Sequence, residues 1–403
     1  MIFKRATSVA AATTTALMWA SLGAPDVRAI ASSASVVTPP TSVAADCSSD
    51  VSKPLGTWLR SLPADTTVSV PTGACYQVDE GLSLQFPVGI TIDGGTFENS
   101  STSPPPAKGH GTPKGSPVFN VLSGSDVTFE NLAIEGANPG GYDAHMAFAG
   151  GIELQGTSGA TIDNVTITAP FGDGITLAPL RGGADHNSGK IKSPVTNVTI
   201  SNVTISGAGR MGVTFGSVNG AQATNLALSD IGLDTFDVEA DQGNEGAENV
   251  TIDGCTSSSA SSSNFARSFF SNGGPGAAKD TGNITVENCT MTEPQGSAAI
   301  LIERPGTKTN DRGPFLFDDD DLACGQSTST SIVACVQVTG ANVEVQDSDL
   351  VFPDASPAEA VYAGAYGADL LFDTDTVTGF GSTGTVDSTS QVTVTSGLWM
   401  PAD

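Results

Sequence analysis

Basic residues and long apolar runs are scarce in this chain of 403 residues. It holds 16 Lys and Arg against 43 Asp and Glu, a formal charge of −27 at pH 7. Such a balance repels nucleic-acid phosphates and anionic membranes, so no nucleic acid is expected as a partner. Beyond the N-terminus, no segment reaches the roughly 20 continuous apolar residues of a membrane-spanning helix, so no membrane span is expected.

Histidine is also scarce, and this narrows the chemistry. His110, His145 and His186 are the three histidines, and no His/Cys group has the spacing of a zinc site. No glycine-rich phosphate loop follows a strand and opens a helix. Because serine occurs throughout, a Ser/His/Asp triad cannot be located. The sequence therefore gives little support to zinc, nucleotide or serine-nucleophile chemistry.

The N-terminus has the pattern of a secretory signal peptide over residues 1–29. Lys4 and Arg5 precede an apolar run that ends in small residues around Ala29, which is typical of such signals. Residues 30–46, rich in Ser, Pro and Ala, show no helical or strand period and predict a flexible leader. We therefore expect a secreted, extracellular protein whose folded domain covers residues 47–403.

All six cysteines follow the signal region, which predicts three disulfides in an oxidising compartment. Pairing each cysteine with its nearest neighbour in sequence gives Cys47–Cys75, Cys255–Cys289 and Cys324–Cys335. Other pairings stay open from the sequence alone.

Short alternating strands separated by polar turns recur along the chain. Examples are "DVTFENLAI" from Asp126, "GATIDNVTI" from Gly159 and "NVTISNVTI" from Asn197. The spacing from Leu226 to Val250 is 24 residues, and longer gaps would carry loops. Such a period, built from short strands, predicts an all-β solenoid whose stacked coils share one core.

The turns explain two further patterns. Asn and Asp tolerate left-handed backbone and suit the corners of a coil, so the Asn-x-Thr sequons are incidental to the repeat. Cys255 and Cys289 hold the same place in "TIDGCT" and "TVENCT". They should therefore lie about 4.8 Å apart on adjacent coils, a spacing that suits a disulfide.

The entry segment carries a resemblance to a known family. It reads "LGTWLRSLPADTTVSVPTGACYQVDEGLSLQFPVGITIDGG" and opens with an amphipathic stretch whose apolar residues are Leu55, Trp58, Leu59 and Leu62. With the repeats, over roughly residues 50–380, the chain resembles the right-handed parallel β-helix proteins of the pectin-lyase-like superfamily. The resemblance implies a single-stranded right-handed parallel β-helix with a short N-terminal capping helix. It also implies action on, or binding of, polysaccharides along one face.

The resemblance carries two further expectations, one for the C-terminal segment and one for the catalytic motifs. The segment after Phe380 is expected to finish the last coil, with Leu398 and Trp399 as its plug. Polygalacturonase-like members of the superfamily carry Asn-Thr-Asp, Asp-Asp, Gly-His-Gly and Arg-Ile-Lys in that order. Here Gly-His-Gly stands at residues 109–111 in a Pro-rich stretch and the other three motifs are missing. That assignment is therefore rejected, and His110 is interpreted as a loop residue.

A cluster of charged residues comes from three consecutive coils, "FGDGITL", "GRMGVTF" and "GLDTFDVEAD". Aligning the inward Ile175, Val213 and Phe236 places Asp173, Arg210 and Asp234 near one corner. Asp173 and Asp234 would then lie two rungs apart, roughly 10 Å at the backbone. That is close to the roughly 6.5–9.5 Å between the carboxyls of an inverting glycosidase.

The same alignment gives an outward column in which Asp237 follows Thr176 and Thr214, with Glu153 one coil earlier. Glu239 lies beyond Asp237 on the same strand face. One carboxylate would protonate the glycosidic oxygen while another activates water, and Arg210 would orient a hydroxyl or a uronate. The candidate catalytic residues are Asp173, Asp234, Asp237, Glu239 and Arg210.

Two inserted loops, "GANPGGYDAHMAFA" and "LRGGADHNSGKIKSPV", would form walls for a sugar chain. The substrate-binding candidates are Glu153, Tyr142, His145, His186 and Lys190.

Three alternatives stand beside this interpretation. The corner would be a mere salt-bridged ladder, with Asp237 and Glu239 solvated. In a lyase, Arg210 would be the base and the acids would bind Ca²⁺ through oxygen. The run Asp318–Asp321 would be a second cation site or simply a solvated loop. The negative balance favours a neutral sugar or a Ca²⁺-dependent site, and no other cofactor is implied.

The sequence favours a monomeric polysaccharide-active enzyme, a hydrolase slightly ahead of a Ca²⁺-dependent lyase, whose partner is a polysaccharide or surface glycan. The rival is a non-catalytic extracellular glycan-binding or adhesion solenoid. An enzyme requires the acids to converge with at least one perturbed pKa, whereas a scaffold would leave them spread and solvated.

Overall fold

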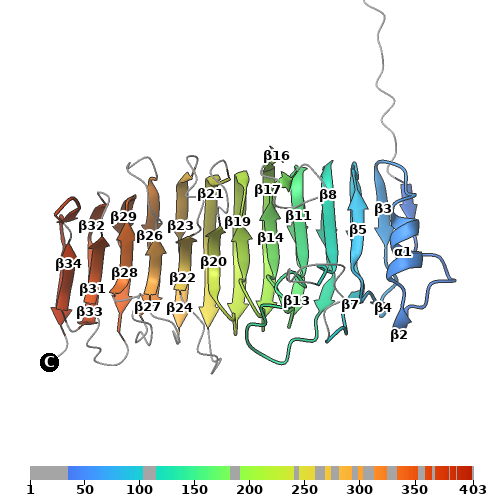
Figure 1. Cartoon of the computed structure of the whole chain (residues 1–403), viewed down its shortest axis with the longest axis horizontal. Helices are drawn as coiled ribbons and strands as arrows, with labels where there is room; N and C mark the ends of the chain where they lie inside the picture. Colours follow the sequence, from blue (N-terminus) through green and yellow to red (C-terminus); the bar gives the residue numbers. More distant parts are fainter. Residues whose placement is uncertain are drawn as a thin grey trace, which may run out of the picture. The chain divides into compact units, whose positions relative to one another are not determined.

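The computed structural model describes residues 35–102, 115–181, 191–239, 245–258, 268–273, 281–292, 298–302, 313–324, 334–352, 359–364, 368–380, 382–386 and 388–401. These residues form a right-handed parallel β-helix, as predicted, within one compact unit of residues 34–403. Figure 1 shows its coils side by side in chain order, from α1 to the last strands. The predicted signal peptide, residues 1–29, lies outside the described residues.

Each coil contributes strands to three parallel sheets, called sheets A, B and C here. Sheet A consists of β5 (Leu82–Gln85), β8 (Phe119–Ser125), β11 (Ile152–Ser158), β14 (Ile175–Ala178), β18 (Val213–Phe215), β20 (Asp234–Glu239), β22 (Ser268–Gly273), β25 (Ala298–Ile302), β28 (Ala334–Thr339), β31 (Glu359–Gly364) and β34 (Ser382–Val386). Sheet B consists of β1 (Ser35–Val37), β3 (Thr66–Ser69), β6 (Ile90–Asp93), β9 (Thr128–Glu130), β12 (Thr161–Asp163), the first parts of β17 (Val195–Ser206), β19 (Val218–Ser229) and β21 (Ala247–Ser258), then β23 (Gly282–Glu287), β26 (Phe315–Asp318), β29 (Asn342–Gln346), β32 (Asp369–Asp373) and β35 (Gln391–Val394). Sheet C consists of β2 (Asp46–Asp50), β4 (Cys75–Gln77), β7 (Thr96–Glu98), β10 (Ala133–Glu135), β13 (Thr166–Thr168), the last parts of β17, β19 and β21, then β24 (Thr290–Thr292), β27 (Asp321–Ala323), β30 (Asp349–Val351), β33 (Asp375–Phe380) and β36 (Gly397–Pro401). A separate antiparallel pair joins β15 (Leu180–Arg181) to β16 (Ile191–Ser193).

The core consists of inward columns in which one residue of each coil stacks on the next. On sheet A, Ile175 pairs with Val213, and Val213 pairs with Phe236, as the sequence alignment predicted. All three side chains are fully buried. Because side chains alternate between the two faces of a strand, this register also fixes which polar residues face outward.

The corners are built by Asn and Asp in left-handed backbone, as predicted. Asn164, Asn202 and Asn225 all have φ between 51° and 54°, a region that Asn tolerates better than most residues. Their side chains bond from coil to coil: Asn225 Nδ2 donates to Asn202 Oδ1 at 2.7 Å. A single side chain thus stabilises both its own turn and the stacking of its neighbour.

The N-terminal end is capped as predicted. Helix α1 (Ser52–Leu59) buries Leu55 and Leu59, and Trp58 and Leu62 pack partly against the same core. None of the helices in the described part of the chain is long and apolar enough to cross a membrane.

The predicted flexible leader is wrong for residues 35–46. Ser35–Val37 forms β1, which pairs in parallel with β3 of sheet B, and Val43 is buried. The Ser/Pro/Ala composition of this segment does not predict a strand. The strand forms because the first complete coil supplies its hydrogen-bond partners. The solenoid therefore begins before residue 47.

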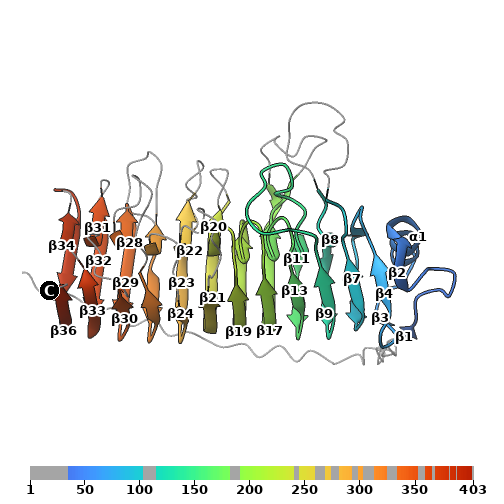
Figure 2. The same ribbon diagram turned by 90° about the horizontal axis from the view of Figure 1, so that it is seen from below.

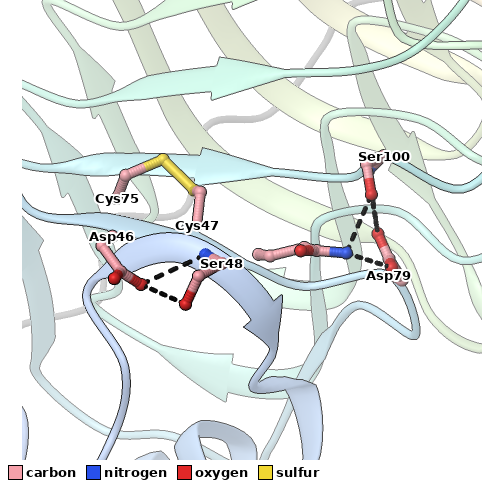
Figure 3. Close-up of a disulfide and its surroundings, with 7 residues drawn as sticks. Asp46, Cys47, Ser48, Cys75, Asp79 and Ser100 are labelled. Carbon is pink, nitrogen blue, oxygen red and sulfur yellow. Dashed lines mark hydrogen bonds between the residues drawn. A yellow bond between two sulfur atoms is a disulfide. The ribbon is translucent and has the colours of Figure 1, made fainter.

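The three predicted disulfides are all present, with Cα–Cα distances of 5.1, 4.5 and 5.4 Å in chain order. Figure 3 shows the first, Cys47–Cys75, between strands β2 and β4 beside the bonds of Asp46 with Ser48 and of Asp79 with Ser100. Cys255 and Cys289 stack on adjacent coils, as the repeat predicted.

Two predictions about the C-terminal coils need correction. Trp399 packs edge-on against Phe372 and Phe380, but Leu398 is 52% exposed, so only the tryptophan plugs the end. The alternation of the strand turns the two neighbours to opposite faces. The run Asp318–Asp321 forms the corner between β26 and β27: Asp319 and Asp321 are exposed, as a solvated turn would have them, but Asp320 is buried.

Candidate functional site

The candidate site lies on sheet A, where β14, β18 and β20 run side by side. Glu153 pairs with Thr176, Thr176 with Thr214, and Thr214 with Asp237, which gives the predicted outward column. The next residue in the column is Ser271 on β22. Thr214, Asp237 and Ser271 are nevertheless buried, so this part of the outward face is shielded from bulk water.

Asp173 stands just before β14 with both carboxylate oxygens occupied. Its Oδ2 accepts hydrogen bonds from Thr176 Oγ1 at 3.0 Å and Thr214 Oγ1 at 2.8 Å, and its Oδ1 accepts from the backbone N–H of Met211 at 3.2 Å. Arg210 Nη1 also lies 3.0 Å from Oδ2. With four donors around it, this carboxylate acts as an anchor for the corner of the coil.

Arg210 joins the coils on both sides of its own. Its guanidinium pairs with Asp173 through one nitrogen and with Glu239 through the other. Burial by itself would lower the pKa of Arg210, but Asp173 and Glu239 more than offset this and raise it. The guanidinium is therefore a permanent cation, held in place by two carboxylates.

Asp237 has the most perturbed environment of the site. It is 4% exposed, and its Oδ1 accepts a hydrogen bond from Ser271 Oγ at 2.5 Å. Burial raises the pKa of Asp237 well above its ordinary value, and the negative charges of Glu239 and Asp234 raise it further. The bond from Ser271 and the charge of Arg210 act in the opposite direction without reversing the shift. Asp237 therefore keeps a proton under conditions in which an ordinary aspartate has lost it.

Glu239 and Asp234 flank Asp237 on the same strand. The side chain of Glu239 is 31% exposed, and that of Asp234 is buried and accepts a bond from Ser268 Oγ at 2.7 Å. One residue, Val238, separates Asp237 from Glu239 on the strand, so their Cα atoms lie about 6.6–6.8 Å apart. A carboxyl with a raised pKa and a carboxyl that pairs with Arg210 therefore lie next to each other on one face.

The remaining predicted residues lie farther away or outside the description. Glu153 is three rungs from Asp237, about 14 Å, and accepts a bond from Gln155 Nε2 at 3.0 Å. Tyr142 and His145 lie on the loop between β10 and β11, which approaches the corner of Arg210. His110, His186 and Lys190 fall outside the described residues.

A preformed metal site is not seen among these acids. Within the described residues, the group with three possible ligand atoms within 4.8 Å of one another is Cys47, Cys75 and Glu98. Its two cysteines form a disulfide. Asp173, whose oxygens already accept from four donors, is poorly suited to bind Ca²⁺.

Sequence reasoning missed Ser268 and Ser271, which hold the carboxyls of Asp234 and Asp237. Both lie in "SFFSNG" on β22, one rung beyond Asp237. A continued alignment of inward residues to Phe270 would have found them, since Phe236 pairs with Phe270.

The strands of the described residues define the class of this protein by its fold, a parallel β-helix. No family model matches the chain, and no curated protein matches it by sequence. Among solved structures, it is similar to an exopolygalacturonase from Thermotoga maritima, with 10% identity, a TM-score of 0.55, and coverage of 91% of this chain and 92% of that one.

Two other solved structures belong to different classes of protein. The surface protein and adhesin PfbA of Streptococcus pneumoniae is 12% identical, with a TM-score of 0.51 and coverage of 91% and 97%. The pre-mature gene product 12 of bacteriophage phi29 is 11% identical, with a TM-score of 0.60. The match covers 89% of this chain but 51% of the phage protein, so the chain spans about half the length of that neighbour. At such identities these likenesses show the fold alone.

Proposed function

We propose that this protein is a secreted hydrolase that cleaves glycosidic bonds of a polysaccharide at the sheet A face around Asp237. The proposal depends above all on one observation: a buried carboxyl with a raised pKa lies beside a glutamate that forms a salt bridge with Arg210. Pairs of carboxyls whose environments separate their pKa values are the usual means of glycoside hydrolysis.

Asp237 is the proposed general acid. Ser271 donates to its Oδ1 at 2.5 Å, which leaves Oδ2 to carry the proton. As the bond between the anomeric carbon and the glycosidic oxygen breaks, that proton passes to the oxygen and Asp237 becomes a carboxylate. The leaving sugar departs as a neutral alcohol.

Glu239 is the proposed partner base. Its carboxylate removes a proton from a water molecule whose oxygen attacks the anomeric carbon. The Cα atoms of Asp237 and Glu239 lie about 6.6–6.8 Å apart on one face of the strand, so their side chains can hold the two carboxyls at the roughly 6.5–9.5 Å that inverting enzymes use. Arg210 orients Glu239, and Asp173 in turn positions Arg210. This assignment replaces Asp173 and Asp234 as the reacting pair, because the oxygens of Asp173 are already engaged.

The state of Arg210 favours a hydrolase over a lyase. A lyase would need an uncharged base near the carbon beside the uronate, but Arg210 is paired with two carboxylates and its pKa is raised. Because that pairing also neutralises its charge, Arg210 offers little attraction to a uronate carboxylate. A neutral polysaccharide fits this face better than a polyuronate.

The test is the release of reducing ends from a panel of neutral and acidic polysaccharides, with absorbance at 235 nm to detect unsaturated products. Wild type would be compared with Asp237→Asn and Glu239→Gln, with Ca²⁺ and with EDTA. Asp369→Asn is the matched control, because Asp369 is an exposed acid on β32 of sheet B. We expect Asp237→Asn to lower kcat roughly 10²–10⁴-fold and the control to retain activity.

Each outcome separates the candidate functions. Absorbance at 235 nm that rises only with Ca²⁺ would establish a lyase instead. No product from a folded wild type that still binds a polysaccharide would refute catalysis and leave the glycan-binding or adhesion solenoid. The salt-bridged Asp173–Arg210–Glu239 chain is the observation that supports this second candidate, since such a network also stabilises a plain scaffold.

A further inference from the structure

The loop between β10 and β11, residues 136–150, is a well-anchored loop beside the candidate site. Asn138 Nδ2 donates to the carbonyl oxygen of Gly207 at 3.2 Å, and the N–H of Gly172 donates to the carbonyl oxygen of Ala149 at 2.9 Å. Met146 and Ala149 pack with Phe171 in a small apolar cluster of their own. Figure 2 shows this green loop standing out beside β11 and β13. The loop is thus fixed to the corner that holds Asp173.

This loop carries one largely exposed aromatic side chain, that of Phe148. Phe148 is 54% exposed, although its neighbours Ala147 and Ala149 are 7% and 6% exposed. Both neighbours contact Gly172: a Cβ on that glycine would lie 2.5 Å from the carbonyl oxygen of Ala147. Gly172 directly precedes Asp173, so the Cα atoms of Phe148 and Asp173 are at most about 13 Å apart.

An apolar ring that is exposed to water is unfavourable for the free protein. The backbone of Phe148 is already fixed on both sides, so binding a flat apolar surface to its ring costs little additional ordering. The C–H face of a sugar ring is such a surface, and it stacks on aromatic side chains without any need for charge. That property suits a chain with a net charge of −27.

We propose that Phe148 is the stacking platform for one sugar ring of the polysaccharide that binds along sheet A, next to the reacting carboxyls. This inference rests on the proposed function but concerns binding, not bond cleavage. It places one end of the saccharide on the β10–β11 loop and directs the chain across β14 and β18 towards Asp237.

The same molecule offers a matched control. Phe86 is 71% exposed and follows β5 at a corner of the coil. β5 lies five rungs from β20 along sheet A, about 24 Å. Phe86 follows the C-terminal end of its sheet A strand, whereas the β10–β11 loop leads into the N-terminal end of β11. Phe86→Ala therefore removes an exposed ring of the same kind from the opposite edge of sheet A, five rungs from Asp237.

The experiment is affinity electrophoresis in native gels that contain one soluble polysaccharide each: a mixed-linkage glucan, a galactomannan or polygalacturonate. One neutral polysaccharide is expected to retard wild type. For that polysaccharide, we expect Phe148→Ala to raise the Kd about tenfold. Phe148→Tyr should retain the affinity because it keeps the ring, and Phe86→Ala should behave as wild type. Thermal unfolding of each variant checks that the substitution has not disturbed the fold.

Equal Kd values for Phe148→Ala and wild type, or an equal loss in Phe86→Ala, would overturn the platform. A folded wild type that no polysaccharide retards would overturn the platform together with the proposed function. Weaker binding by Phe148→Ala in a protein that releases no product would uphold the platform and refute only the catalytic role of Asp237.

Discussion

The strongest quantitative prediction concerns two buried acids at the corner between sheets B and C. Asp320 is 2% exposed and Asp375 is fully buried. Oδ1 of Asp320 accepts from the N–H of Cys289 at 2.8 Å, and Oδ1 of Asp375 accepts from the N–H of Ser348 at 2.9 Å. Among the described residues, neither Oδ2 has a hydrogen-bond partner. Burial raises the pKa of Asp320 to about 8 and that of Asp375 to about 7.

These two acids contribute most to the stability of the folded state at acid pH. In the folded state each group keeps a proton that the unfolded chain loses above about pH 4, so unfolding releases protons and the free energy of unfolding falls as pH rises. The loss continues until the folded groups themselves ionise, near pH 7 for Asp375 and pH 8 for Asp320. At about 1.4 kcal/mol per pH unit, each acid removes about 2–3 kcal/mol between pH 5 and pH 7.

The variant Asp320→Asn isolates this contribution, because the amide keeps the shape and the acceptor for Cys289 but cannot ionise. Relative to wild type, it should gain about 2–3 kcal/mol of stability on going from pH 5 to pH 7. Guanidinium unfolding is followed by the fluorescence of Trp399 after Trp19 and Trp58 are replaced by phenylalanine. Trp399 reports on the C-terminal coils because it packs against Phe372 and Phe380.

Asp163→Asn is the control for that experiment. Hydrogen bonds from Ser201 and Asn202 lower the pKa of Asp163, so it is ionised in both states between pH 5 and pH 7. Its effect on stability should therefore be the same at the two pH values. A constant difference between Asp320→Asn and wild type at pH 5 and pH 7 would show that Asp320 is ionised when folded and would refute the reasoning.

Two further predictions concern the stacking of the coils. Replacing both Cys255 and Cys289 by alanine opens a loop of 34 residues and should lower the free energy of unfolding by about 3–4 kcal/mol, measured by denaturant titration; a loss below 1 kcal/mol would contradict the estimate. Asn225→Ala should be less stable than Asn225→Gly by about 1–2 kcal/mol. Both variants lose the bond to Asn202, but only alanine is strained at the φ of 54° that this position adopts. Equal melting temperatures of the two variants would exclude backbone strain as the cause.

Much of this molecule follows from local pattern. Two-residue alternation fixes which side chains face inward, and the Asn and Asp corners fix where strands end, so the pairing of Ile175 with Val213 and Phe236 was predictable. The three disulfides followed from the same periodicity and from their short separations. The strand in the Ser/Pro/Ala segment, Ser35–Val37, did not, because its partner β3 lies 31 residues away in sequence.

The sequence by itself determined the solenoid and the column on which Asp237 lies, because both depend on a repeat that is written into consecutive residues. Only the tertiary structure decided the state of each acid in that column. Asp173 is saturated by donors from two adjacent coils, whereas Asp237 is buried beside Glu239 and Asp234 with Ser271 as a donor. Charge and pKa depend on burial and on neighbours from other coils, which no single stretch of sequence contains.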